Sequence, residues 1–76
     1  KHRKKVKAMK FLVKWFDLDE VVDSALVSYF HAVRLMKGEG VEEASASLAL
    51  CYSVKGVPLT LETADGYRMT FEKVEG

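Results

Sequence analysis

The residues of this sequence best suited to metal binding or nucleophilic catalysis are His2, His31 and Cys51. A metal site needs several His, Cys or carboxylate ligands that converge on one point, and these three residues stand at none of the usual ligand spacings. A nucleophilic pair of Cys51 and His31 is conceivable, but no residue beside Cys51 indicates an activated thiolate. The sequence therefore predicts no catalytic residue, metal site, cofactor or small-molecule substrate, and we expect a protein that is not an enzyme.

The clearest functional signal is a basic run at the start of the chain. Seven of the first 14 residues are Lys or Arg, and no acidic residue precedes Asp17. Each phosphate that such residues neutralise releases a condensed counterion, which gives salt-dependent binding with little sequence preference. Binding to the phosphate backbone of DNA or RNA is therefore the leading functional hypothesis. The residues predicted to make these contacts are Lys1, Arg3, Lys4, Lys5, Lys7, Lys10 and Lys14.

The composition indicates a single small folded domain. The chain has 76 residues, of which 49% are hydrophobic and 11% aromatic. A chain of this size buries only about 60–65% of the surface that its unfolded form exposes, so a partner or a longer parent chain often supplies further burial. The first residue is Lys1 rather than Met, and we expect residues 1–76 to be one domain excised from a longer chain. Residues 1–5 form its basic arm.

The single cysteine, Cys51, rules out an internal disulfide framework and favours an intracellular protein, cytoplasmic or nuclear. The longest uncharged run, residues 44–54, is too short to span a bilayer. A basic start followed by apolar residues is similar to the first half of a signal peptide, but Lys10 and Lys14 interrupt the apolar part. Attachment to an anionic membrane through the basic run ranks last among the binding hypotheses.

The stretch F-D-L-D-E-V at residues 16–21 has the pattern of a helix start. Asp17 is a suitable N-cap, and Glu20 three residues later completes an aspartate form of the capping box. Apolar residues then recur at three- and four-residue spacing until Gly38, a typical helix stop. We therefore expect one long helix from about Leu18 to Gly38.

Two apolar residues of this expected helix fall outside its main apolar stripe. They are Val27 and Phe30, and they lie beside His31 and Arg34. Either another segment of the chain covers them, or they contact a partner. The second interpretation, together with an unpaired sheet edge, gives the alternative function. This is a protein–protein interaction or homo-oligomerisation domain of a larger protein, with an interface at Val27, Phe30, His31 and Arg34.

Two turns predict an antiparallel meander of three strands in the second half of the chain. A three-residue loop at Ala64-Asp65-Gly66, with Gly66 in the left-handed conformation, sets the register of the last two strands. The cross-strand pairs that follow are Leu59–Phe71 and Leu61–Met69 on one face, and Thr60–Thr70 and Glu62–Arg68 on the other. These pairs match apolar with apolar, hydroxyl with hydroxyl, and acid with base, as cross-strand neighbours should.

A further strand is expected at residues 46–54, where apolar residues alternate with small ones. A two-residue turn at Lys55-Gly56 places its apolar side chains on the same face as those of the hairpin. The rival is a helix over residues 41–52, because several apolar residues there also recur at helical spacing. Pro58 is a further objection to a central strand at this point. The agreement between the two turns favours the strand.

Residues 6–15 are expected to form a strand. In this conformation Met9, Phe11, Val13 and Trp15 share one face. A helix here has an apolar arc too wide for a surface helix, and it leaves almost no loop before the expected helix that follows. The helical alternative, which changes the order of elements to α-α-β-β-β, stays open.

The predicted fold class is therefore α+β in the order β-α-β-β-β. One long helix packs on a small, mainly antiparallel sheet that ends in the three-stranded meander. The predicted core residues are Phe11, Val13, Trp15, Val22, Leu26, Tyr29, Val33, Leu50, Tyr52, Leu59, Leu61, Met69 and Phe71. The residues predicted on the other face of the sheet are Lys10, Lys14, Thr60, Glu62, Arg68 and Thr70.

Overall fold

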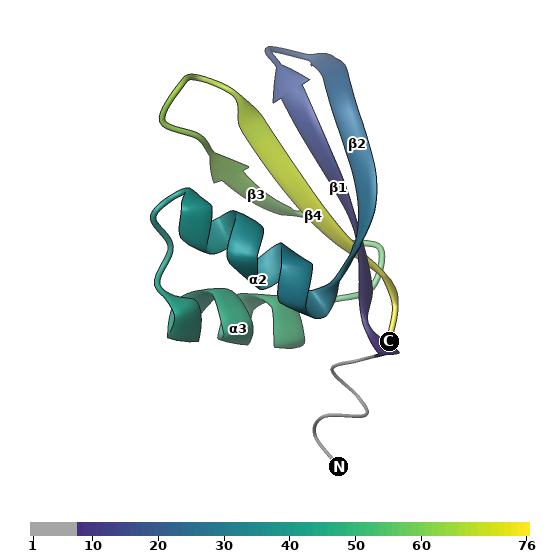
Figure 1. The fold of residues 1–76 in the computed structure, drawn as a ribbon. Helices are drawn as coiled ribbons and strands as arrows, with labels where there is room; N and C mark the ends of the chain where they lie inside the picture. The colour runs from purple at the N-terminus through teal and green to yellow at the C-terminus, as the bar shows by residue number, and fades with distance from the viewer. Residues whose placement is uncertain (1–7) are drawn as a thin grey trace.

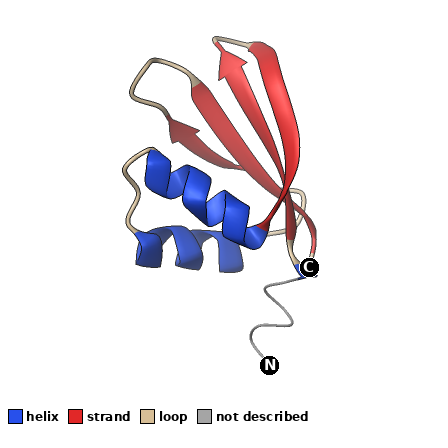
Figure 2. Cartoon of the chain, viewed as in Figure 1, coloured by secondary structure: helices blue, strands red, loops and turns tan. Residues whose placement is uncertain are grey.

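A computed structural model describes residues 8–76 as one antiparallel sheet with two helices on the same side of it (Figures 1 and 2). The elements are β1 (Lys10–Asp17), β2 (Glu20–Ser28), α2 (Tyr29–Gly38), α3 (Glu43–Cys51), β3 (Leu59–Glu62) and β4 (Arg68–Glu75). The strands lie in the order β2-β1-β4-β3. The α+β class is confirmed, whereas the order of elements is β-β-α-α-β-β and not the predicted β-α-β-β-β.

The long helix predicted after Asp17 is wrong, because the chain there forms β2 followed by the 10-residue helix α2. Asp17 does not cap a helix but pairs with Glu20 across a two-residue turn. β2 then pairs with β1 along its length except at Val22, where the register shifts, and this cross-strand pairing outweighs the local capping pattern. The helix starts after Ser28, whose Oγ accepts a hydrogen bond from the backbone N–H of His31 at 3.1 Å.

The β1–β2 turn places Leu18 at a backbone φ of 58°, in the left-handed region. A side chain there costs about 1–2 kcal/mol, and this one is 83% exposed, so little burial compensates. We expect Leu18→Gly to raise the free energy of unfolding by about 0.5–1 kcal/mol, measured by urea denaturation. The matched control is Asp19→Gly, which removes no positive φ and should lower it. A less stable Leu18→Gly protein contradicts this turn geometry.

The strand predicted for residues 6–15 is confirmed from Lys10 onward, where the chain forms β1. Ala8 is helical and Met9 lies outside β1, so the predicted strand starts too early. Side chains of alternate residues point to opposite faces of the sheet, as predicted. Met9, Phe11 and Val13 are buried on the helix side, and Trp15 packs partly against the same core. The prediction for residues 6 and 7 falls outside the described residues.

The β3–β4 hairpin has the predicted loop and register. Gly66 has a φ of 94°, and the backbone N–H of Thr63 donates to the carbonyl oxygen of Tyr67 at 2.8 Å. The observed pairs are Leu59–Phe71, Thr60–Thr70, Leu61–Met69 and Glu62–Arg68. Each of these four pairs was expected from the sequence, because the loop length and the cross-strand chemistry agreed.

The strand predicted at residues 46–54 is wrong, because this part of the chain forms α3, as in the rival interpretation. Ala46 and Leu50 are fully buried, whereas Leu48 and Tyr52 are exposed. The predicted Lys55-Gly56 turn is present, but it connects α3 to β3 and does not join two strands. β4 already pairs with β1 on one side and with β3 on the other, so another strand cannot pair with it. Residues 43–51 instead cover the apolar face of the sheet as a helix.

The core lies between the sheet and the helix pair. Its largest fully buried side chains are Phe11, Val13, Leu50, Met69 and Phe71. Three residues predicted for the core, Val22, Leu26 and Tyr52, are exposed, because they lie on β2 or at the end of α3 and not on a long helix or a third strand.

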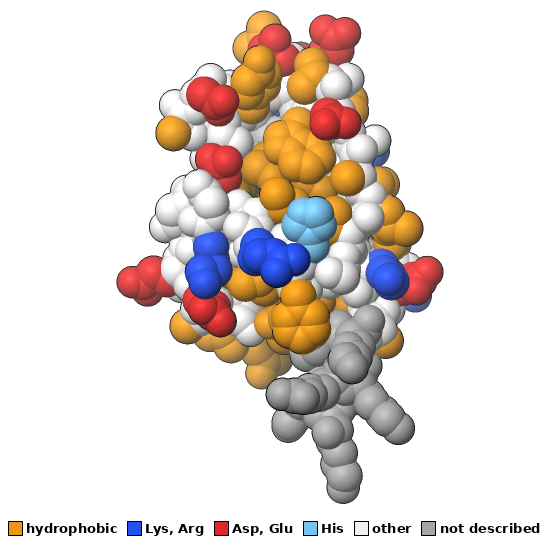
Figure 3. Space-filling view, viewed as in Figure 1, with side chains coloured by type: hydrophobic (Ala, Val, Ile, Leu, Met, Phe, Trp, Pro, Cys, Tyr) orange, Lys and Arg blue, Asp and Glu red, His pale blue; other side chains and the backbone are white. Residues whose placement is uncertain are grey.

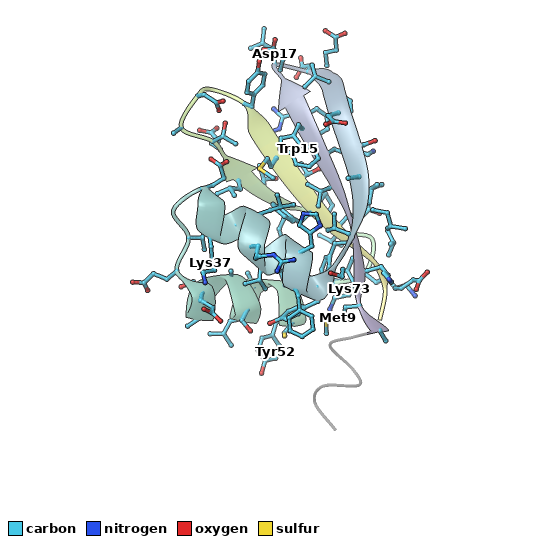
Figure 4. All side chains as sticks on the ribbon, viewed as in Figure 1. Met9, Trp15, Asp17, Lys37, Tyr52 and Lys73 are labelled. Carbon is cyan, nitrogen blue, oxygen red and sulfur yellow. The ribbon has the colours of Figure 1, made fainter. Side chains whose placement is uncertain are left out.

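A buried lysine side chain binds the C-terminal end of α3. Lys73 is 5% exposed, and its Nζ donates to the carbonyl oxygen of Cys51 at 3.1 Å. The last carbonyl groups of a helix have no intrahelical partner and carry partial negative charge, so a cation is favourable there. Figure 4 shows Lys73 projecting from β4 toward this end of the helix pair. Lys73 is therefore a structural residue of the core.

Candidate functional site

The helix-free face of the sheet, here called the open face, carries the described part of the basic run. Lys10 lies between Ser28 of β2 and Glu75 of β4, and Lys14 lies between Ser24 of β2 and Thr70 of β4. The structure thus places both lysines on one face, as predicted. The other predicted phosphate-binding residues fall outside the described part of the chain. They are Lys1, Arg3, Lys4, Lys5 and Lys7.

A third cation of the open face is Arg68, which was expected on this face but not as part of a binding site. Its guanidinium carbon lies 4.5 Å from the centroid of the Phe16 ring, in a cation–π contact. Phe16 was expected to precede a helix. Only the continuation of β1 to Asp17 places its ring on the open face, between the lysines and the β1–β2 turn.

Apolar and acidic side chains complete the open face. Leu12 lies opposite Leu26 on β2 and opposite Glu72 on β4. Leu26 is 63% exposed, whereas Leu12 is half-buried. The open face is therefore a mixed surface, with cations along β1 and β4 and an exposed leucine toward the β2 edge.

Acidic residues gather at the end of the sheet that carries the two hairpin turns, as Figure 3 shows for the helix side. They are Asp17, Asp19, Glu20, Asp23, Glu62 and Asp65. Figure 4 shows Met9 and Asp17 near opposite ends of β1, so the basic start of the chain joins the sheet at the end away from these carboxylates. An anionic ligand is therefore repelled from the hairpin end. At the other end the charge of Lys10 is balanced by Glu75 on β4, so the excess positive charge there belongs to the basic run of the sequence.

The residues predicted for a protein interface separate into two environments. Phe30, His31 and Arg34 are exposed on α2, and Phe30 packs edge-on against the Tyr29 ring at a centroid distance of 5.1 Å. Val27 is 5% exposed, because it lies on β2 with its side chain toward the helices. Val27 is therefore a core residue, and the surface at this place consists of the other three.

The two described residues with the most reactive side chains, His31 and Cys51, lie on different helices. His31 is exposed on α2, and Cys51 is half-buried at the end of α3. Residues 8–76 contain no group of three or more His, Cys, Asp or Glu side chains placed to hold a metal ion. That the chain is not an enzyme stays a prediction.

Tyr29 is a buried ionisable group that links the two helices. Its hydroxyl shares a hydrogen bond with Ser47 Oγ of α3. Burial raises the pKa of Tyr29 above its ordinary value of 10.0, and the hydrogen bond with Ser47 acts in the opposite direction. The hydroxyl therefore stays protonated at neutral pH, and it ties α2 to α3.

Two shallow hollows lie near the hairpin end of the sheet. One, of about 210 Å³, is lined by Trp15, Val22, Asp23 and Tyr67. The other, of about 200 Å³, is lined by Leu18, Glu62, Thr63, Gly66, Tyr67 and Arg68. Both are smaller than the roughly 300–1,000 Å³ of a typical ligand pocket. Extended surfaces are therefore better candidates for binding than these hollows.

Comparison with known proteins found no similar protein. The chain matches no protein-family model, no curated protein and no solved structure. Within residues 8–76, neither helix has the length and apolar character needed to cross a bilayer. The function is therefore argued from the surfaces described above.

Proposed function

We propose that this chain is a non-enzymatic nucleic-acid-binding module that contacts the phosphate backbone of DNA or RNA. The observation that carries the proposal is the position of Lys10 and Lys14, which continue the basic run of residues 1–7 onto the open face. Lysine is a flexible point charge, which suits contact with phosphate oxygens more than readout of base edges. We therefore expect strong salt dependence and little sequence preference.

The charge layout supports a defined orientation of the bound strand. Residues 1–7 carry a net charge of +5, whereas residues 8–76 carry −4, with many of their carboxylates at the hairpin end. A phosphate backbone is therefore drawn to the basic segment and the neighbouring half of the open face.

The test measures fluorescence anisotropy of labelled single- and double-stranded DNA and RNA against protein concentration, at several salt concentrations. Lys14→Glu is expected to raise Kd about tenfold at low salt and to reduce the slope of log Kd against log salt by about 1. The matched control is Arg34→Glu, which makes the same change in net charge on α2, on the other side of the sheet. It should raise Kd less than about threefold.

Either of two results would contradict this proposal. The first is the absence of binding to all four nucleic acids even at low salt. The second is an equal loss of affinity in Lys14→Glu and Arg34→Glu, which would mean that net charge alone governs binding and that the open face has no particular role.

Association with a protein is the second candidate function, and the surface of α2 favours it. Phe30 is 50% exposed beside His31 and Arg34. Aromatic and arginine side chains dominate the binding energy of many protein interfaces. If a second copy binds here, Phe30→Ala should weaken self-association in sedimentation experiments, while changes on the far side of the sheet should not. Unchanged self-association in Phe30→Ala excludes this surface as the contact between copies.

A further inference from the structure

The two edges of the sheet differ in their protection against pairing with another strand. β3 has only four residues, follows Pro58 and carries Glu62. Short length, proline and charge are the usual ways in which proteins block an edge. β2 has nine residues, and within the described chain its outer side has no neighbouring strand. Figure 1 shows β2 at the margin of the sheet, so its outer backbone groups are open to a partner.

The charge of β2 is confined to the half of the strand next to the turn. Glu20 and Asp23 lie in this half, where the pairing with β1 also shifts register. Both features discourage further pairing there. The other half, residues 24–28, has the sequence Ser-Ala-Leu-Val-Ser, with neither charge nor proline. This half is therefore the part of the edge that can accept another strand.

We propose that the β2 edges of two copies of this chain pair antiparallel about a two-fold axis at Leu26. The opposed pairs are then Ser24–Ser28, Ala25–Val27 and Leu26–Leu26. This register uses all five uncharged residues and opposes no charge. An axis at Ala25 instead places Asp23 opposite a valine. The product is one sheet of eight strands.

The side chain of Leu26 has the exposure that this register predicts. It is 63% exposed on the open face and lies directly opposite Leu12 of β1. At the proposed axis the two Leu26 side chains meet, and a row of four leucines crosses the junction between the copies. Removal of this apolar surface from water favours association. The axis is perpendicular to the sheet, so the helices of both copies lie on one side and the two open faces become continuous.

Charge complementarity favours a second copy of this chain as the occupant of the edge. Antiparallel pairing places the start of one β2 near the end of the other. The acidic residues at the start are Asp17, Asp19, Glu20 and Asp23. The end, Ser28, lies opposite Lys10, where the chain enters the sheet after the five basic residues of the segment 1–7. The acidic start of each β2 is therefore directed toward the end of the other copy at which Lys10 lies.

The first experiment measures the monomer–dimer equilibrium by analytical ultracentrifugation from micromolar to millimolar concentration. We expect a dimer whose Kd rises with salt. Leu26→Lys should raise Kd at least about tenfold, because two lysines then face each other across the axis. The matched control is Leu48→Lys, at a similarly exposed leucine on α3, for which we expect less than about a threefold change.

The second experiment tests the register by disulfide cross-linking in a Cys51→Ser background. Directly opposed residues of antiparallel strands have Cα atoms about 4.5–5.5 Å apart, within disulfide range, so Leu26→Cys should cross-link to itself under mild oxidation. The control Ser24→Cys should not, because the register places the two copies of this position four residues apart along the strands. That separation is roughly 13 Å, beyond the reach of a disulfide.

Circular dichroism shows whether each variant is folded. Because Leu26 is exposed in the monomer, we expect the Leu26→Lys monomer to be folded. A wild-type monomer at every concentration would falsify the proposal. So would an equal effect of Leu48→Lys, or faster cross-linking of Ser24→Cys than of Leu26→Cys. Nucleic-acid binding is measured separately on the Leu26→Lys monomer. The proposal of nucleic-acid binding and the proposal of a dimer through β2 can therefore fail independently.

Discussion

Replacement of Phe71 by alanine is expected to lower the free energy of unfolding by about 3–5 kcal/mol. Phe71 is fully buried in β4, the strand that joins both hairpins into one sheet. Its neighbours in the register are Val13 on β1 and Leu59 on β3, so truncation leaves a cavity where three strands meet. A domain of this size has a total stability of only about 4–11 kcal/mol, so a large fraction of the variant should be unfolded.

The measurement is urea denaturation followed by the fluorescence of Trp15, the single tryptophan of the chain. Phe30→Ala is the matched control, because this ring is 50% exposed on α2, and it should cost about 1 kcal/mol or less. If the two variants lose similar stability, the ring of Phe71 does not occupy the centre of the core. That result would contradict the strand order β2-β1-β4-β3.

Leu50→Ala has the second largest expected effect, a loss of about 2–5 kcal/mol in the free energy of unfolding. The side chain is fully buried on the inner side of α3, one turn after the buried Ala46. α3 covers the core together with α2, so the cavity opens beneath both helices. Thermal unfolding followed by circular dichroism should show a clear fall in Tm.

Alanine substitutions at the neighbouring residues Leu48 and Tyr52 are the controls, and they distinguish a helix from a strand at residues 46–52. In the helix, Leu48 and Tyr52 are exposed, and alanine at either position should cost less than about 1 kcal/mol. In a strand, both residues share a face with Leu50, so all three substitutions should cost similar amounts. Similar losses at the three positions would therefore contradict α3.

The sequence was a good guide where neighbouring residues decide the structure. The β3–β4 hairpin followed from Gly66 and from four pairs of matched chemistry, because a short loop sets the register of the strands that it joins. The inner face of β1 followed from the alternation of apolar residues that ends at Trp15. The outward positions of Lys10 and Lys14, on which the proposed function rests, followed from the same alternation.

The predictions from sequence were wrong where one segment fits two local patterns and contacts with distant segments determine which of them forms. Asp17 and Glu20 match a helix cap as well as the two ends of a tight turn, and the pairing of β2 with β1 decided for the turn. Residues 46–51 fit both periodicities, and the need to cover β4 decided for α3. Local patterns differ by only a fraction of a kcal/mol per residue, less than the burial that tertiary packing supplies.

The sequence alone determined the α+β class, the C-terminal hairpin, the faces of β1 and the separation of a basic start from an acidic remainder. Only the tertiary structure decided that β1 lies between β2 and β4, and this placement created the surfaces proposed for binding. It buried Val27, brought Arg68 over Phe16, and left Leu26 exposed on the edge strand of the described sheet. The reason is physical: a side chain becomes core or surface according to which distant strand pairs beside it, and no local pattern contains that information.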